Sequence, residues 1–128
     1  MPVTPKTYRD LIVWQRAIGY VTNIYRASHN WPRDEAFGLT TQIRRCAVSI
    51  PSNIAEGSAR RSYGDYSRFL NIALGSLFEL QTQLEIARNL GYIDELKYGE
   101  LFGQSREIEA MLSKLIQRVN ESKKTPAP

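Results

Sequence analysis

The sequence predicts an all-α protein, an antiparallel up-down-up-down four-helix bundle. Four stretches of this 128-residue chain repeat apolar residues every three or four positions, which is the spacing of one helix face. The breaks between these stretches are short, and short connections make neighbouring helices antiparallel. No stretch alternates apolar and polar residues for long enough to form a strand. The length and a hydrophobic share of 42% fit one globular domain.

The first helix is predicted over about residues 8–28 and carries two apolar stripes. The stripe assigned to the bundle core contains Leu11, Trp14, Ile18, Val21 and Tyr25. The second stripe contains Val13, Ala17, Tyr20, Ile24 and Ala27. Together they cover roughly 200° of the helix circumference, more than a bundle core requires. We therefore expect the second stripe to be an oligomer interface; the alternative is a wide core that absorbs both stripes.

The second helix is predicted from just after Pro32 to about Ala59, with a core stripe formed by Leu39, Ile43, Cys46 and Ile50. Pro51 lacks the amide that would bond the carbonyl of Ala47, so the sequence predicts a kink in this helix. Asn53 stands where the next apolar residue of the stripe is expected. We expect its side chain to hydrogen-bond backbone that the proline leaves free.

Glu56 and Gly57 complete this structural motif with Pro51 and Asn53. Glu56 stands four residues before Arg60, the favourable order for a helical ion pair. A role for Glu56 as a general base, oriented by Asn53, is the alternative to a structural role. Gly57, like Gly75 in the third helix, predicts a close approach between helices, because glycine costs about 1 kcal/mol in a helix interior.

The third helix is predicted to begin after Ser62, with Asp65 three residues on as a capping partner, and to end at Gly91. Its stripe contains Tyr66, Leu70, Ala73, Leu77, Leu80, Leu84 and Ala87. The fourth helix is predicted from about Asp94, with a stripe of Leu101, Ser105, Ile108, Leu112, Leu115 and Val119. We expect one domain over residues 1–120 and a disordered tail over residues 121–128.

Several function classes lack support in the sequence. No apolar run approaches the ~20 residues needed to cross a bilayer, and the start has no apolar signal region, so we expect a cytoplasmic protein without a membrane anchor. Cys46 is the one cysteine and His29 the one histidine, too few for a helical-bundle metal site. Phosphate-loop, dinucleotide-binding and hydrolase motifs are absent. We expect no catalytic residues, no metal and no cofactor.

The basic residues concentrate in the first half of the chain. Residues 1–68 contain ten Lys and Arg against five Asp and Glu, whereas residues 69–128 contain seven against eight. The candidate nucleic-acid-binding residues are Arg44, Arg45, Arg60, Arg61 and Arg68. Guanidinium groups bind phosphates through paired hydrogen bonds, and an oligomer would repeat each group of arginines. Pairing of these arginines with acidic residues at subunit contacts is the alternative.

Three segments carry a family resemblance: DLIVWQRA, FGLTTQIRRCAVSIPSNIAEGSAR and SRFLNIALGSLFELQTQLEIARNLGYI. They resemble the bacterial four-helix-bundle family first noticed in intervening sequences of 23S rRNA genes. The resemblance covers about residues 8–120 and implies a ring of five subunits. It extends more distantly to accessory proteins of diversity-generating retroelements, which bind nucleic acid and a reverse transcriptase. The family implies no catalytic residues.

Two functions follow as expectations. The first is a non-enzymatic homopentameric scaffold that binds RNA or DNA through its basic surface, independently of base sequence. The second is a protein-interaction adaptor that recruits a partner such as a reverse transcriptase.

Overall fold

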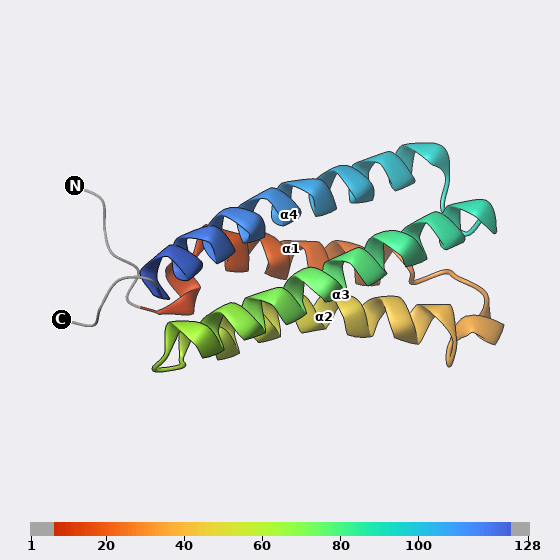
Figure 1. The fold of residues 1–128 in the computed structure, drawn as a ribbon. Coiled ribbons are helices and arrows are strands. Elements are labelled where there is room, and N and C mark those ends of the chain that lie inside the picture. The colour runs from red at the N-terminus through yellow and green to blue at the C-terminus, as the bar shows by residue number, and fades with distance from the viewer. Residues whose placement is uncertain (1–6, 124–128) are drawn as a thin grey trace.

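The computed structural model describes residues 7–123, which form four long α-helices and two short 3-10 turns (Figure 1). The elements are η1 (Tyr8–Asp10), α1 (Ile12–Ala27), η2 (Arg33–Glu35), α2 (Leu39–Ser58), α3 (Tyr63–Asn89) and α4 (Glu95–Lys123). No strand occurs within residues 7–123. The predicted all-α class and four-helix bundle are confirmed.

Each helix packs against two others, and the helices follow one another around the bundle in chain order. The packed pairs are α1 with α2, α2 with α3, α3 with α4, and α1 with α4. Along α2 and α3, Cys46 contacts Glu79 and Ser49 contacts Ser76. The partner numbers fall as the numbers along α2 rise, as in neighbouring antiparallel helices. α1 and α3 therefore lie diagonally opposite each other.

Local side-chain bonds fix the helix ends. The Ser62 hydroxyl accepts a 3.1 Å hydrogen bond from the amide of Asp65, which confirms the predicted cap of α3. The carboxylate of Asp65 does not return to Ser62 but lies 3.9 Å from Arg68. Gly91 has a φ of 76° after α3, the left-handed conformation predicted for that position. At the start of α4, the Asp94 carboxylate accepts a 2.7 Å bond from the amide of Lys97.

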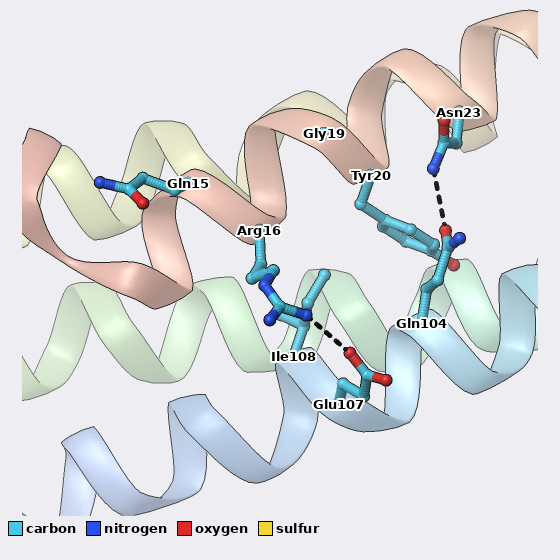
Figure 2. Close-up of a pocket in the computed structure, with 8 residues that line it drawn as sticks. All are labelled: Gln15, Arg16, Gly19, Tyr20, Asn23, Gln104, Glu107 and Ile108. Carbon is cyan, nitrogen blue, oxygen red and sulfur yellow. Dashed lines mark hydrogen bonds and ion pairs between the residues drawn. The ribbon is translucent and has the colours of Figure 1, made fainter.

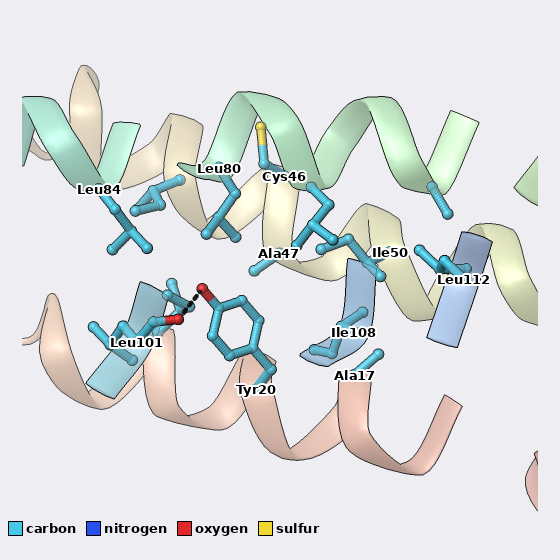
Figure 3. Packing of buried hydrophobic residues seen from close by; sticks show 14 of the residues in the cluster. Ala17, Tyr20, Cys46, Ala47, Ile50, Leu80, Leu84, Leu101, Ile108 and Leu112 are labelled. Atoms are coloured by element: carbon cyan, nitrogen blue, oxygen red, sulfur yellow. Dashed lines mark hydrogen bonds between the residues drawn. The ribbon is translucent and has the colours of Figure 1, made fainter. Parts of the chain in front are cut away.

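In α1, the stripe predicted as an oligomer interface faces the centre of the core, and the stripe predicted as core is only partly buried. Val13, Ala17, Tyr20 and Ile24, predicted as an oligomer interface, are buried within the bundle. Figure 3 shows Ala17 and Tyr20 directed toward core residues of the other helices. Ala27 is half-buried. Ile18 and Tyr25, predicted as core, are each 42% exposed.

The physical reason for this error is the composition of α1. Both stripes are apolar, so periodicity alone does not say which one faces the bundle. The small side chain of Ala17 and the hydroxyl group of Tyr20, which bonds the Leu101 carbonyl of α4 at 3.0 Å, suit the side of α1 that packs against α4. The interface prediction for this stripe is therefore wrong. The alternative, a wide core, is closer to the structure, because Leu11, Trp14 and Val21 of the other stripe also pack partly against the core. Ile18 and Tyr25 are the exposed residues of that stripe.

The motif of α2 joins α2 to α3. α2 continues through Pro51 as one helix, so the predicted kink stays a prediction. The Asn53 amide donates to the carbonyl of Ser49 at 2.8 Å and to its hydroxyl at 2.9 Å, and not to Ala47 as predicted. A helical side chain lies over the preceding turn, which brings Asn53 to Ser49. The Ser49 hydroxyl lies 2.8 Å from the Ser76 hydroxyl, so the network crosses to α3.

Gly57 lies at a close approach between α2 and α3. A Cβ atom on Gly57 would lie 2.9 Å from Cβ of Phe69 and 3.2 Å from the carbonyl oxygen of Tyr66. The predicted close approach at Gly57 is confirmed. Gly75 has nothing within 4 Å of the corresponding position, so the same prediction is wrong for contacts within this chain.

The fourth helix is longer than predicted, because α4 continues to Lys123 rather than ending near Asn120. The Asn120 side chain accepts a 2.7 Å hydrogen bond from the Ser67 hydroxyl of α3, which anchors the last part of α4 to the bundle. Residues 121–123 therefore belong to the helix. The rest of the predicted disordered tail, residues 124–128, lies outside the described residues.

Candidate nucleic-acid interface

The turn between α2 and α3 brings three of the five predicted arginines together. Arg60 and Arg61 lie in the connection after α2, and Arg68 lies in the second turn of α3. The close approach at Gly57 and the Ser62 cap hold the two helix ends near each other. We call Arg60, Arg61 and Arg68 the turn arginines.

The ring of Phe69 positions two of these arginines. The guanidinium carbon of Arg60 lies 4.6 Å from the ring centroid, and that of Arg68 lies 4.5 Å from the same centroid. Guanidinium groups stack on aromatic rings and keep their N–H donors free at the edge. Arg61 is exposed between them in the sequence. The turn arginines therefore present three cations from one short segment.

Two carboxylates accompany this cluster. Arg60 lies 3.1 Å from Glu56 and Arg68 lies 3.9 Å from Asp65, measured between side-chain nitrogen and oxygen atoms. All four side chains are more than 40% exposed, and exposed ion pairs contribute only about 0–1 kcal/mol. The predicted pair of Glu56 with Arg60 is confirmed. Neither pair is strong enough to prevent a phosphate group from binding the arginines.

The remaining two predicted arginines lie elsewhere. Arg44 donates to the Ser28 hydroxyl at 2.9 Å and to the Tyr25 carbonyl at 3.3 Å, and its guanidinium lies 4.6 Å from the Tyr25 ring centroid. It therefore joins the end of α1 to α2. Arg45 is exposed on α2, roughly 22 Å along the helix axis from Arg60 at 1.5 Å per residue. The structure does not bring Arg44 and Arg45 into the cluster at the turn.

Further basic residues lie at the same end of the bundle as the turn arginines. Figure 1 shows η1, the turn between α2 and α3, and the last part of α4 together at this end. Arg9 in η1 lies 5.5 Å from the Trp14 ring, and Arg118 is exposed near the end of α4. Sequence reasoning missed these residues because they are distant in the chain. The predicted antiparallel topology is the signal that identifies them, because it puts the start of the first helix, the turn between the second and third helices, and the end of the fourth helix at one end of the bundle.

A groove between α1 and α4, with a volume of about 210 Å³, contains charged groups that already pair with each other. Figure 2 shows Arg16 and Glu107 across this groove, 3.0 Å apart, and Asn23 bonded to Gln104 at 3.1 Å. These contacts connect the two helices. The groove therefore serves packing rather than the binding of a charged ligand.

The other candidates for chemistry have structural partners. Burial raises the pKa of the Cys46 thiol to about 11, and the thiol lies 3.3 Å from a Glu79 carboxylate oxygen, so it stays protonated near neutral pH. Glu56 pairs with Arg60, and Asn53 bonds to Ser49. Over residues 7–123 no group of three or more His, Cys, Asp or Glu side chains is placed to hold a metal ion. No helix in this range is long and apolar enough to cross a membrane.

The fold and this surface define a four-helix-bundle protein with a basic end, and comparison with known proteins gives its family. The sequence profile of the 23S rRNA-intervening sequence protein family matches residues 9–114. The chain belongs to this family. A similar solved structure is a protein of unknown function from the S23 ribosomal protein family of Bacteroides thetaiotaomicron, with a TM-score of 0.77 and 27% sequence identity over 83% of this chain and 96% of that chain. No curated protein matches the sequence.

Proposed function

We propose that this protein is a non-enzymatic, homo-oligomeric scaffold that binds RNA or DNA through its phosphates, independently of base sequence. The observation that carries the proposal is the cluster of turn arginines, in which Arg60 and Arg68 share the Phe69 ring and Arg61 is exposed beside them. Phosphate contacts position a protein on nucleic acid but carry no base information. No base-reading element is needed for this activity.

The geometry of the turn suits phosphate binding. A stacked guanidinium loses less side-chain freedom when it binds than a freely moving one, because the ring already restricts it. The partners of Arg60 and Arg68 are exposed carboxylates, so a phosphate competes with weak contacts. Arg9 and Arg118 extend the positive charge across the same end of the bundle.

The oligomer multiplies these contacts. A ring of five subunits, which the family resemblance implies, would present the turn arginines five times. Linked weak sites bind a long polyanion far more tightly than one site alone when their spacing lets them bind together. The exposed apolar side chains of α1, Ile18 and Tyr25 at 42% exposure, support self-association. A cytoplasmic location is part of the proposal, and the free thiol of Cys46 is compatible with it.

An adaptor function is the second candidate, and a separate surface favours it. Phe37, just before α2, is 99% exposed, and Leu96, in the first turn of α4, is 74% exposed. Figure 1 shows the starts of α2 and α4 at the end of the bundle away from the turn between α2 and α3. Such side chains fit a protein partner, for which a reverse transcriptase is the candidate named by the more distant resemblance. The two functions use opposite ends of the bundle and are therefore separable by mutation.

The test is a binding titration with single-stranded and duplex oligonucleotides of unrelated sequences, repeated over a series of salt concentrations. We expect similar affinity for different sequences and a steep loss of affinity as salt rises, because each neutralised phosphate releases a counterion. Absence of binding at low salt would refute the nucleic-acid function and leave the adaptor as the better account.

A further inference from the structure

The first two helices of the chain, α1 and α2, have an apolar groove between them on the outside of the bundle. The groove lies between α1 and α2, has a volume of about 280 Å³, and is lined by Trp14, Ile18, Val21, Val48 and Ala55 among others. Ile18 is 42% exposed and Val48 is 41% exposed. Within residues 7–123 these two side chains remain partly exposed, whereas Trp14 packs against the Tyr8 ring at one end of the groove. We call this surface the groove face.

The outward side of α3 exposes large apolar side chains as well. Ile72, Phe78 and Ile86 are 43%, 46% and 44% exposed. Ile72, Gly75, Thr82 and Ile86 form a row along one side of the helix, and Phe78 lies next to that row. Gly75 has open space around it, so another backbone is free to approach α3 closely there. We call this surface the ridge face. An outward helix face of a lone bundle is normally polar.

The two faces lie on different sides of the molecule. α1 and α3 each pack against α2 and α4 but not against each other. The groove between α1 and α2 and the outward side of α3 therefore do not belong to one continuous patch. A contact between the two faces would join unlike surfaces of two copies, which produces a ring or an open chain rather than a two-fold dimer.

The groove face and the ridge face also differ in the charge of the residues around them. Residues 11–33 and 36–55, which contain all of α1 and most of α2, have no Asp or Glu. Their cations include Arg45, which is exposed on α2, and Arg44, which lies over the Tyr25 ring between α1 and α2. The ridge face, by contrast, has exposed carboxylates at both flanks: Glu79 toward α2, 3.3 Å from the Cys46 thiol, and Glu85 toward α4, 3.5 Å from the Tyr98 hydroxyl. An apolar groove with basic surroundings thus matches an apolar ridge with acidic neighbours.

We propose that the groove face of one copy binds the ridge face of a second copy, so that the chain assembles head to tail. This inference rests on the homo-oligomeric part of the proposed function and deepens it by naming both surfaces. Ile18 and Val48 on one copy pack against Phe78 and Ile86 on the next. Arg45 lies near the acidic residues of the neighbouring ridge, which assigns it to assembly rather than to nucleic-acid binding.

The first part of the test measures the mass of single variants by light scattering at tens of micromolar. Ile18→Glu on the groove face and Phe78→Glu on the ridge face should each reduce the oligomer to a monomer, because each places a charge in a desolvated contact. Val48→Glu and Ile86→Glu are second variants for the same faces if either protein is poorly folded by circular dichroism. Leu96→Glu, an exposed apolar residue outside both faces, is the matched control and should keep the mass of the unchanged protein.

The second part mixes the two monomeric variants. The Ile18→Glu copy retains an intact ridge and the Phe78→Glu copy retains an intact groove, so one contact remains available. The mixture should therefore form a one-to-one dimer and stop there. Full-size oligomers from either variant, or no dimer in the mixture, would overturn the inference without affecting the nucleic-acid titration. A monomeric unchanged protein would overturn both the inference and the proposed oligomer.

Discussion

The hydroxyl group of Tyr20 on α1 donates a 3.0 Å hydrogen bond to the backbone carbonyl of Leu101 on α4, inside the bundle core (Figure 3). Tyr20 is only 2% exposed, and burial raises the pKa of its hydroxyl group well above the ordinary value. The side chain therefore remains a neutral donor over the physiological pH range. Together with the pairs Arg16–Glu107 and Asn23–Gln104, this contact links the first and last helices of the chain.

Replacing Tyr20 with Phe should lower the free energy of unfolding by about 1 kcal/mol, the usual contribution of one hydrogen bond. The ring still fills its place in the core, so the fold and the oligomer mass should not change. Denaturant unfolding with light scattering measures both quantities. A change in mass without a change in stability would contradict the core position of Tyr20 and favour the interface role.

Replacing Gly57 with Ala should destabilise the protein by about 1–3 kcal/mol, because the new Cβ would lie 2.9 Å from Phe69 Cβ and 3.2 Å from the Tyr66 carbonyl oxygen. Gly103 is the matched control. It lies within α4 with nothing inside 4 Å, so Gly103→Ala should stabilise the protein by up to about 1 kcal/mol. Thermal melts of both variants provide the measurement. Equal shifts of the melting temperature in the same direction for both variants would show that the close packing around Gly57 does not decide the effect of the substitution.

The network from Asn53 through Ser49 to Ser76 should behave as a unit. Asn53→Leu should cost about 1–3 kcal/mol, because it leaves the Ser49 groups without this donor. In a double-mutant cycle with Ser76→Ala, the two effects should not add, since both act through the Ser49 hydroxyl. A matching cycle of Asn53→Leu with Pro51→Ala should be additive. Coupling to Pro51 instead of Ser76 would favour the role that the sequence predicts for Asn53.

The hydrogen bonds of Glu35, at the end of the bundle away from the turn arginines, should make the stability of the protein depend on pH. The Glu35 carboxylate accepts bonds from the Leu39 amide at 3.1 Å and from the Tyr92 hydroxyl at 2.8 Å, and these bonds lower its pKa. As the pH falls, Glu35 therefore takes up a proton at a higher pH in the unfolded chain than in the folded protein. The stabilisation from these bonds is fully present above the pKa of Glu35 in the unfolded chain, and it is lost as the pH falls through the lower pKa of the folded protein. In Glu35→Gln the fall of melting temperature between about pH 5 and pH 3 should be smaller. An unchanged pH profile would show that Glu35 makes no such contribution.

Much of the fold is predictable because three of the four helices have a single main apolar stripe. In α3, Leu70, Leu77 and Leu84 repeat at helical spacing and are all fully buried. α1 has two apolar stripes, and the choice between them depends on contacts with α4 that lie about 80 residues away, such as the one between Tyr20 and Leu101. Local spacing contains no information about that contact, so periodicity alone does not show that the stripe with Tyr20 lies at the centre of the core and the other stripe at its edge.

The candidate site is predictable only in part for a similar reason. Arg60, Arg61 and Arg68 are close in the sequence, and the Phe69 ring brings the guanidinium groups of Arg60 and Arg68 together in space. Arg44 is also an arginine in the basic half of the chain, but its guanidinium group donates hydrogen bonds to Ser28 and Tyr25 and so joins α2 to the end of α1. Charge counting identifies candidate arginines, whereas tertiary contacts decide which of them are free for a ligand.

The central claim is that the turn arginines bind phosphate, and reversal of Arg60 and Arg61 to Glu tests it. The control reverses Arg33 and Lys97 at the opposite end, which changes the net charge equally, and light scattering checks that both variants keep their assembly. The direct measurement is the slope of the logarithm of the binding constant against the logarithm of salt concentration, which becomes shallower by about 0.9 for each duplex phosphate that the protein no longer neutralises. The account predicts a shallower slope and weaker binding for Arg60→Glu with Arg61→Glu, and a slope near that of the unchanged protein for the control. Equal slopes for the two double variants would contradict it.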